Sequence, residues 1–377
     1  GHRGITTAAR LFAVAMAWVI GHGAMASPDP IGRPAEAAIA PPAAPARVLV
    51  IHAYHPGLSW TDGVQRGLTE VFEAKHVEVH TEYLDTKRYR LAEVDHTMAG
   101  VMRAKYAKAP PDVVLTSDNH ALEFARRHRE TLFPGVPKVF CGINDYRPAL
   151  IEGMSHVTGV AEATSPRRTF ELMRELRPDL QRVVVLGDGT TTGGAELAAA
   201  RAALGSTRDG VTLEYVEVVD FDATLDRLGG LDRETDAVLL TVMTRDVFGR
   251  FYPFEASGRR VAEASAAPVF GLWDFYLGTG VVGGHMADGE AQGRTAARLA
   301  MRVIEGQDVE PIPVELDSPN RLLVDHAALK RFDIDPDRVP AEATVVNRPP
   351  GLWRDHRREL GVLAGVMLGE AVAMVRS

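Results

Sequence analysis

Short apolar runs alternate along the chain with segments in which apolar residues recur at helical spacing. Residues 48–51 are all apolar and three of them are β-branched, which is typical of a strand buried in a parallel sheet. In residues 60–73 the apolar side chains recur every three to four positions, which predicts a helix with one apolar face. Ser59 opens that helix, and with Asp62 three residues later it resembles a capping box. A buried strand that runs through a polar loop into a helix is where open α/β sheets bind ligands.

The same strand–loop–helix pattern recurs in two series along the chain. In the first series we expect further strands over 77–84, 113–116 and 138–143, and helices over 91–106 and 121–132. In the second series we expect strands over 182–186, 211–219, 237–242 and 269–272, and helices over 166–176, 195–204, 223–228, 258–265 and 289–305. Three extended segments are predicted to connect the two series or to complete their folds. They are 157–161 (itself a short strand), 281–284 and 311–324.

Strands that alternate with helices form parallel sheets with right-handed crossovers. The sequence therefore predicts an α/β fold of two lobes, each a parallel sheet flanked by helices, with a cleft between them. We expect this domain over residues 47–348. Lobe I would cover about 47–160 plus part of 285–312, and lobe II about 161–284 plus part of 313–345.

The N-terminal segment has the layout of a secretory signal peptide. Arg3 and Arg10 precede the apolar run 11–20, and Ala24-Met25-Ala26 is an A-x-A cleavage site, so we expect a signal peptide over 1–26. Residues 27–46 are rich in Ala and Pro and are predicted to form a disordered linker. These features place the mature domain in the periplasm.

The C-terminal segment favours an anchor in the inner membrane. Residues 360–375 are apolar apart from Glu370, and glycines four positions apart (361, 365 and 369) are typical of membrane helices that pack closely as dimers. We expect a juxtamembrane segment over 349–359 and a transmembrane helix over 360–377. That helix is shorter than the roughly 20 residues that span a bilayer. A membrane span would therefore be one that Ser377 cuts short, and a packed amphipathic C-terminal helix is the alternative.

Composition and motifs exclude several classes of protein. The net charge of −8 and the lack of a long basic run argue against nucleic acid as a partner. Cys141 is the single cysteine and is expected to be a buried apolar residue. No P-loop, G-x-S-x-G or H-E-x-x-H motif is present, and His76 and His80 would lie about 13 Å apart on a strand. We expect no enzymatic activity, no cofactor and no metal.

Polar or aromatic residues recur at the carboxyl ends of the predicted strands. A ligand cleft needs aromatic faces for apolar area, and carboxylates and amides that fix a polar head group. Asn, Asp and Ser at such positions also cap the next helix, and for any single residue this alternative stays open. The predicted ligand-binding residues are Tyr54, His55, Ser59, Trp60, Asp118, Asn119, Asn144, Asp188, Thr244, Trp273 and Asp274.

Several segments resemble the periplasmic sensor domains of certain bacterial membrane receptors. These sensor domains are themselves similar to ABC-transporter substrate-binding proteins. The resemblance covers residues 47–360. It implies a type I periplasmic-binding-protein fold of the Venus-flytrap kind, fused through a membrane helix to a histidine kinase or a diguanylate cyclase. The residues that carry it are His55-Pro56-Gly57, Trp60-Thr61-Asp62, Gly271-Leu272-Trp273-Asp274-Phe275-Tyr276-Leu277-Gly278, Val282-Gly283-Gly284, Asn320-Arg321, Leu329-Lys330-Arg331-Phe332 and Asn347-Arg348-Pro349-Pro350.

The sequence thus favours a sensor domain that signals by closing its lobes on a small molecule. Tyr54 and Trp273 would form apolar walls, and Asp118 and Asp274 would bind an ammonium group or hydroxyls. A substrate-binding protein that delivers solute to an ABC permease is the alternative, and an enzyme using the same cleft is a third hypothesis without motif support. The further side chains expected to hydrogen-bond the ligand are Asn119, Asn144 and Thr244.

Overall fold

The computed structural model describes residues 45–349 of the chain. The signal peptide predicted over 1–26, nearly all of the linker over 27–46, the juxtamembrane segment over 349–359 apart from its first residue, and the helix over 360–377 lie outside the described residues. Within 45–349, no helix is both long enough and apolar enough to cross a membrane.

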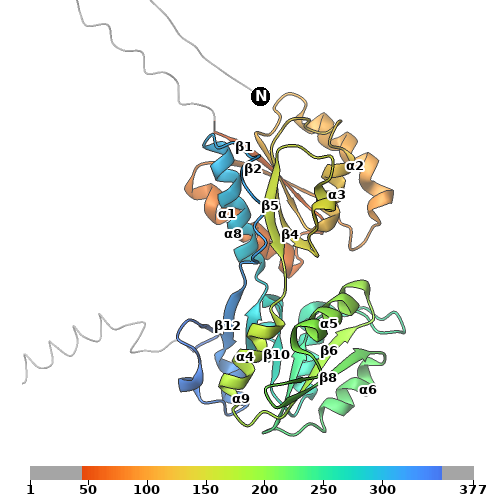
Figure 1. The fold of residues 1–377 in the computed structure, drawn as a ribbon. Coiled ribbons are helices and arrows are strands. Elements are labelled where there is room, and N and C mark those ends of the chain that lie inside the picture. The colour runs from red at the N-terminus through yellow and green to blue at the C-terminus, as the bar shows by residue number, and fades with distance from the viewer. Residues whose placement is uncertain (1–44, 350–377) are drawn as a thin grey trace, which may run out of the picture. The chain divides into compact units, whose positions relative to one another are not determined.

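The first sheet is built from the N-terminal strands, all of which run parallel (Figure 1). Its order is β2-β1-β3-β4-β5, with β1 next to the centre. Residues 48–51 of β1 are fully buried, which confirms the expected strand. The strands are β1 (Arg47–His52), β2 (Glu78–Tyr83), β3 (Val113–Ser117), β4 (Lys138–Asn144) and β5 (Val157–Glu162).

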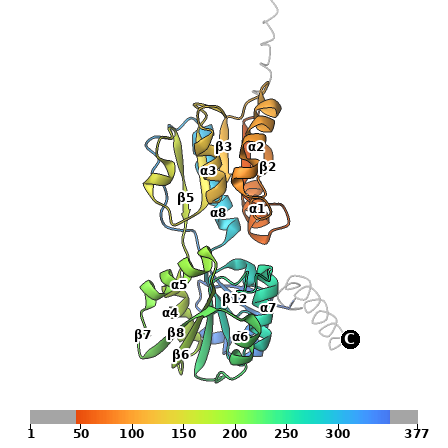
Figure 2. The same ribbon diagram turned by 90° about the vertical axis from the view of Figure 1, so that its right-hand side faces the viewer.

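Helices cover both faces of this sheet (Figure 2). Because side chains alternate along a strand, Val48 and Val50 of β1 pack in the same core cluster as α1 (Ser59–Ala74) and α8 (Gly289–Ile304). Leu49 and Ile51 pack in the cluster with the helices of the opposite face, α2 (Leu91–Tyr106) and α3 (Asn119–Arg127).

Helices α1 and α8 pack against each other through glycines. A Cβ on Gly293 would lie 2.1 Å from the backbone oxygen of Val64, and one on Gly67 would lie 2.0 Å from that of Glu290. The absence of side chains at these positions therefore allows the two backbones to approach. This contact fixes α8, which is distant in sequence, onto the first sheet.

The start of α1 differs from the prediction. Ser59 is the first helical residue as expected, but the capping box is wrong, because Leu58 is the N-cap and no side chain caps the helix. The Asp62 carboxylate instead accepts a hydrogen bond from the backbone N–H of Gly57 (2.9 Å). The Ser59 hydroxyl donates to the carboxylate of Glu255.

The second sheet has the order β10-β9-β6-β8-β7 and is parallel except for β7 (Figure 1). The antiparallel edge strand β7 is absent from the sequence prediction, because only two residues form it. The strands are β6 (Arg182–Asp188), β7 (Thr207–Arg208), β8 (Val211–Val218), β9 (Asp236–Leu240) and β10 (Val269–Gly271). The helices of this part are α4 (Pro166–Leu176), α5 (Thr191–Leu204), α6 (Phe221–Leu228) and α7 (Phe254–Ala264).

A third, three-stranded sheet contains segments that the sequence analysis expected to be crossings. Its order is β11-β12-β13, with β12 antiparallel to β11 and parallel to β13. A backbone hydrogen bond from Val282 to the carbonyl of Val269 joins it to β10 (2.6 Å). The remaining elements are β11 (Gly283–Met286), β12 (Arg321–Asp325), β13 (Thr344–Val346), α9 (His326–Arg331), and the 3₁₀ turns η1 (Pro148–Ile151), η2 (Asp274–Tyr276) and η3 (Pro336–Arg338).

Within residues 45–349, the chain passes between the two large sheets after β5, before α8 and before β12. These three crossings are hydrogen-bonded to one another. Asn320 donates to the carbonyl of Ala163 (2.7 Å) and to the hydroxyl of Ser165 (2.8 Å). Gln292 donates to the carbonyl of Ala161 (3.0 Å) and to the hydroxyl of Ser318 (3.1 Å). More than one segment therefore joins the two parts, as the sequence predicts.

Candidate functional site

Most of the predicted site residues lie at or just beyond the carboxyl ends of parallel strands. In the first sheet Tyr54 follows β1, Asp118 follows β3 and Asn144 ends β4. In the second sheet Asp188 ends β6 and Trp273 follows β10. Because the carboxyl ends of parallel strands share one edge of a sheet, each set gathers at one edge, where open α/β sheets bind ligands.

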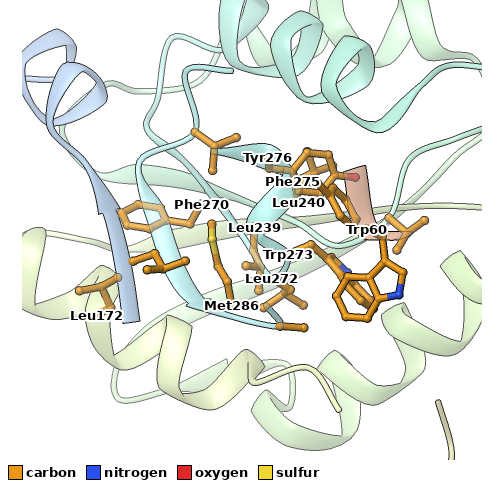
Figure 3. Close-up of a cluster of buried hydrophobic side chains, with 14 of the residues drawn as sticks. Trp60, Leu172, Leu239, Leu240, Phe270, Leu272, Trp273, Phe275, Tyr276 and Met286 are labelled. Atoms are coloured by element: carbon orange, nitrogen blue, oxygen red, sulfur yellow. The ribbon is translucent and has the colours of Figure 1, made fainter. Parts of the chain in front are cut away.

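Two tryptophans bring the two edges together. The indole N–H of Trp60, on α1, donates to the Asp118 carboxylate (2.9 Å), and both residues are buried. The ring of Trp60 meets that of Trp273 edge to face, with centroids 5.7 Å apart (Figure 3). Three of the predicted residues, from α1, β3 and β10, therefore meet in one place.

An aromatic stack continues behind Trp273 (Figure 3). Its ring lies parallel to that of Phe275, with centroids 5.5 Å apart, and Phe275 stacks on Phe254 of α7 at 4.1 Å. The buried hydroxyl of Tyr276 accepts a hydrogen bond from the backbone N–H of Met243 (3.3 Å). This packing fixes the orientation of Trp273 and gives the site a rigid apolar wall.

Glu162 is a buried acid that the sequence analysis missed. It ends β5 and is only 3% exposed, and neither of its carboxylate oxygens has a hydrogen-bond partner within residues 45–349. Burial raises its pKa well above the ordinary value, and the nearby acids Asp118, Glu196 and Asp274 raise it further. The Asn144 amide lowers this pKa in part, although it lies outside hydrogen-bonding geometry.

Asp118 and Asp274, two of the acids predicted from the sequence, also have raised pKa values. Burial raises the pKa of Asp118 to about 6, although it accepts hydrogen bonds from Trp60 and from the hydroxyl of Ser117 (2.7 Å). Burial, and then the charge of Asp288, raises the pKa of Asp274 to about 7. These carboxyl groups are therefore poised to ionise when a cationic group enters the site.

A cation faces these acids from the loop after β2. The ammonium group of Lys87 lies 4.5 Å from the centroid of the Tyr54 ring. Burial lowers the pKa of Lys87, and Asp118, Asp188 and Glu162 oppose that effect in decreasing order. Lys87 was also missed from the sequence, because it lies beyond the end of its strand.

A buried donor accompanies the unpartnered acid. The indole N–H of Trp273 has no acceptor within residues 45–349, and the side chain is 5% exposed. An unpaired buried polar group costs about 1–3 kcal/mol. Trp273 and Glu162 therefore offer one donor and two acceptor atoms that a ligand or water would satisfy.

Two predicted residues bond mainly to each other. The carboxylate of Asp188 accepts from the backbone N–H (2.6 Å) and the hydroxyl (2.9 Å) of Thr244, and from the backbone N–H of Thr190 (3.1 Å). A Cβ on Gly193 would lie 2.1 Å from this carboxylate, which thus sits against the start of α5. The turn at the start of α5 therefore holds the protein's own carboxylate.

Three other predicted residues bond groups of the protein itself. The side-chain amide of Asn119 bonds both backbone groups of Asn144, at 3.1 and 3.0 Å, and so fixes the end of β4. The ring of the half-buried His55 lies 2.9 Å from the carbonyl of Pro56, and Ser59 bonds Glu255. The ligand role of each of these residues stays a prediction.

Two hollows in the described surface lie away from these residues. One, of about 380 Å³, is lined by residues of α4, β12 and the segment before β13, including Arg168, Glu171 and Arg321. The other, of about 400 Å³, is lined by Arg47, Glu82 and their neighbours. Neither contains a predicted site residue, so the candidate site rests on the chemistry of its side chains.

Comparison with known proteins identifies the fold. No protein-family model matches the chain, and no curated protein does. The solved structures that match include a conserved domain protein from Vibrio cholerae O1 biovar El Tor, at 18% identity over 80% of this chain and 99% of that chain, with a TM-score of 0.55. The ligand-free, open structure of CD0873, a substrate-binding protein with adhesive properties from Clostridium difficile, matches at 13% identity over 81% of this chain and 100% of that chain, with a TM-score of 0.61.

A third match is the ABC domain from Streptococcus pneumonia in complex with L-Trp, at 18% identity over 80% of this chain and 99% of that chain, with a TM-score of 0.54. The fold is that of type I periplasmic binding proteins. Identities this low establish the type I binding-protein fold and leave the ligand open.

Proposed function

We propose that this chain is an extracytoplasmic domain that binds a small molecule between its two sheets and does not transform it. The observation that carries the proposal is Glu162, a buried carboxylate with two unpartnered oxygens, accompanied by the unpartnered N–H of Trp273. Buried polar groups are normally hydrogen-bonded, so these two side chains favour a ligand site. The neighbours named as a substrate-binding protein and as an L-Trp complex support the same function.

The chemistry of the site favours an amphipathic ligand with an ammonium group. Glu162, Asp118 and Asp274 supply acidic oxygens, and the rings of Trp60 and Trp273 supply apolar faces. A cation in such a place gains both from the carboxylates and from the aromatic faces. We therefore propose that an ammonium group of the ligand pairs with Glu162.

Lys87 extends this proposal to a zwitterion. Its ammonium group lies over the Tyr54 ring on the acidic side of the site. A ligand carboxylate would pair with it, while the ligand ammonium pairs with the acids. An amino acid with an apolar side chain has these three features, which is the ligand class that we propose.

Lobe closure is the proposed mechanism. A ligand that contacts groups of both sheets favours the closed arrangement by its differential affinity for the two states. The hydrogen-bonded crossings around Asn320 and Gln292 would then act as the hinge. The strand β13 follows this region, so closure would reach the segment that leads to the C-terminus.

The proposed cellular role is that of a sensor domain of a membrane receptor of the histidine kinase or diguanylate cyclase type, located in the periplasm and tethered to the inner membrane as a dimer. The sequence resemblance described above supports this role. The second candidate is a substrate-binding protein of an ABC transporter, favoured by the names of the Clostridium and Streptococcus neighbours. The reading frame beyond Ser377 distinguishes them: a kinase or cyclase supports the sensor, and a stop codon beside permease genes supports transport.

Calorimetric titration tests the binding function. L-Trp and the other amino acids are titrated first, followed by nucleosides and sugars, and we expect an amino acid to bind. Glu162→Gln removes the charge and should weaken that binding by about 2 kcal/mol or more, roughly 30-fold in the dissociation constant. A chain that binds none of these compounds, or a variant with unchanged affinity, would contradict the proposed site.

Glu82→Gln is the matched control. Glu82 is also a buried glutamate of the first sheet, but its carboxylate has partners, namely Tyr106 (2.9 Å) and Lys105. We expect the control to change stability and to leave the dissociation constant unchanged. Equal losses of affinity in the two variants would indicate a general effect of losing a buried charge.

A further inference from the structure

A cluster of three metal-ligating side chains lies on the face of the first sheet that α2 and α3 cover. Asp95 and His96 lie on α2, and His128 directly follows α3. The Asp95 Oδ1 atom is 3.7 Å from the Nε2 atom of His96 and 3.7 Å from the Nε2 atom of His128. One ligand atom from each residue lies within 4.8 Å of the others.

Two of these ligand atoms are buried and unpartnered. Asp95 is 4% exposed and His128 is 7% exposed. Within residues 45–349, neither Asp95 Oδ1 nor His128 Nε2 has a hydrogen-bond partner, because 3.7 Å is too long for such a bond. A buried acceptor and a buried ring nitrogen that face each other without bonding are both satisfied by one shared cation.

The groups around the cluster orient its ligands. Arg127 donates to the other carboxylate oxygen of Asp95 (3.2 Å) and also pairs with Glu123, which leaves Asp95 Oδ1 free. Such an outer hydrogen bond is typical of carboxylates that bind metals. Burial lowers the pKa of His128, the charge of Asp95 opposes this effect, and His96 and Arg103 add to it, so the shift favours the neutral imidazole that binds a metal.

The distances suit a small transition-metal ion. Zinc–nitrogen and zinc–oxygen bonds of about 2.0–2.1 Å at tetrahedral angles place ligand atoms roughly 3.4 Å apart. The two separations of 3.7 Å are close to this value. The side chain of His96 is 92% exposed, so it is free to turn toward the other two ligands. Two imidazoles and one carboxylate favour zinc and similar first-row transition metals over Mg²⁺ or Ca²⁺, which prefer oxygen ligands.

We propose that Asp95, His96 and His128 form a zinc-type site with a water as the fourth ligand, which ties α2 to the end of α3. Asn119 lies at the edge of the sheet where the candidate ligand site begins. His128 lies about 13 Å from it along α3. The site would therefore be separate from the proposed binding of a small molecule.

Calorimetric titration of the chelator-treated full chain with ZnCl₂ tests the proposal. The chain has thirteen histidines, so the assignment rests on variants. His96→Ala, at an exposed helical position, should abolish the binding of one equivalent of zinc or raise its dissociation constant at least about tenfold. An unchanged titration in this variant overturns the proposal, and so does a wild-type chain that binds no zinc.

His80→Ala is the matched control. His80 is a half-exposed histidine that lies 2.7 Å from the carboxylate of Glu78, and it is not part of the three-residue group. We expect its zinc titration to equal that of the wild type. The unfolding temperature adds a second measurement: zinc should raise it in the wild type and in His80→Ala, and not in His96→Ala. Mg²⁺ should raise it in none of them, and an equal rise with Mg²⁺ would contradict a site of this type.

Discussion

Asp118→Asn removes the charge of a buried acid whose pKa is raised to about 6 by burial. The substitution keeps the shape of the side chain. The amide oxygen can still accept from the indole N–H of Trp60, and the amide NH₂ group can donate to the hydroxyl of Ser117. Asn and Asp have similar steric demands, so the substitution adds no strain to the backbone at this position, where φ is +75°. The variant therefore isolates the ionisation of Asp118.

The expected effect follows from the difference between the folded and unfolded pKa values. The rise from 3.8 to about 6 is about two units, which corresponds to roughly 3 kcal/mol. Well below the unfolded pKa of 3.8 the carboxyl group is protonated in both states, and ionisation does not affect stability. Between pH 4 and 6 the folded state binds more protons than the unfolded state, so the free energy of unfolding falls as the pH rises. Above about pH 6 the loss is complete.

Chemical denaturation of both proteins from pH 4 to pH 8 measures this effect. The quantity of interest is the free energy of unfolding of the wild type minus that of Asp118→Asn, because titrating groups that do not interact with Asp118 cancel in this difference. We expect the difference to fall by about 2.5 kcal/mol between pH 4 and pH 7, because the unfolded carboxyl group is already partly ionised at pH 4.

A difference for Asp118→Asn that stays flat would show that Asp118 has an ordinary pKa in the folded protein. A difference that rises with pH would show that Lys87 and the hydrogen bonds outweigh burial. Either outcome would refute the reasoning about the buried acids of the candidate site.

Three further predictions concern packing, the crossings and the ligand. Gly293→Ala should destabilise the protein by about 1–3 kcal/mol in denaturant titrations, because its Cβ would meet the backbone of Val64, whereas Gly194→Ala, where nothing lies within 4 Å, should be neutral or stabilising. Asn320→Ala removes two hydrogen bonds between crossings and should lower the free energy of unfolding by about 1–2 kcal/mol; no change would show that these bonds are replaced by water. Lys87→Met should weaken the binding of an amino acid more than the binding of the corresponding amine, as measured by calorimetry. Equal losses of affinity for the two compounds would argue that Lys87 does not pair with a ligand carboxylate.

Much of the secondary structure could be predicted from local pattern. The apolar runs of β1 and β6 and the helical spacing of α2 and α4 are local signals, and these elements form where expected. The edge strand β7 and the third sheet were missed, because short strands exist only through their pairing with distant residues.

The candidate site was predictable only in part, for the same reason. The rule that ligands bind at strand ends identified Trp60, Asp118 and Trp273, which the structure brings together. It missed Glu162, because β5 extends one residue further than its apolar run. It missed Lys87, because that side chain reaches the acids from several residues beyond β2.

The sequence by itself determined the α/β class, the order of the strands and helices, and the kind of residues gathered at the strand ends, because periodicity and strand ends are local properties of the chain. The tertiary structure decided which of these side chains keep unsatisfied atoms. Asp188 and Thr244 bond each other, whereas Glu162 and Trp273 remain buried without partners. Hydrogen bonding and burial depend on residues far apart in the chain, so only the folded arrangement can separate a side chain that holds the protein together from one that is free to hold a ligand.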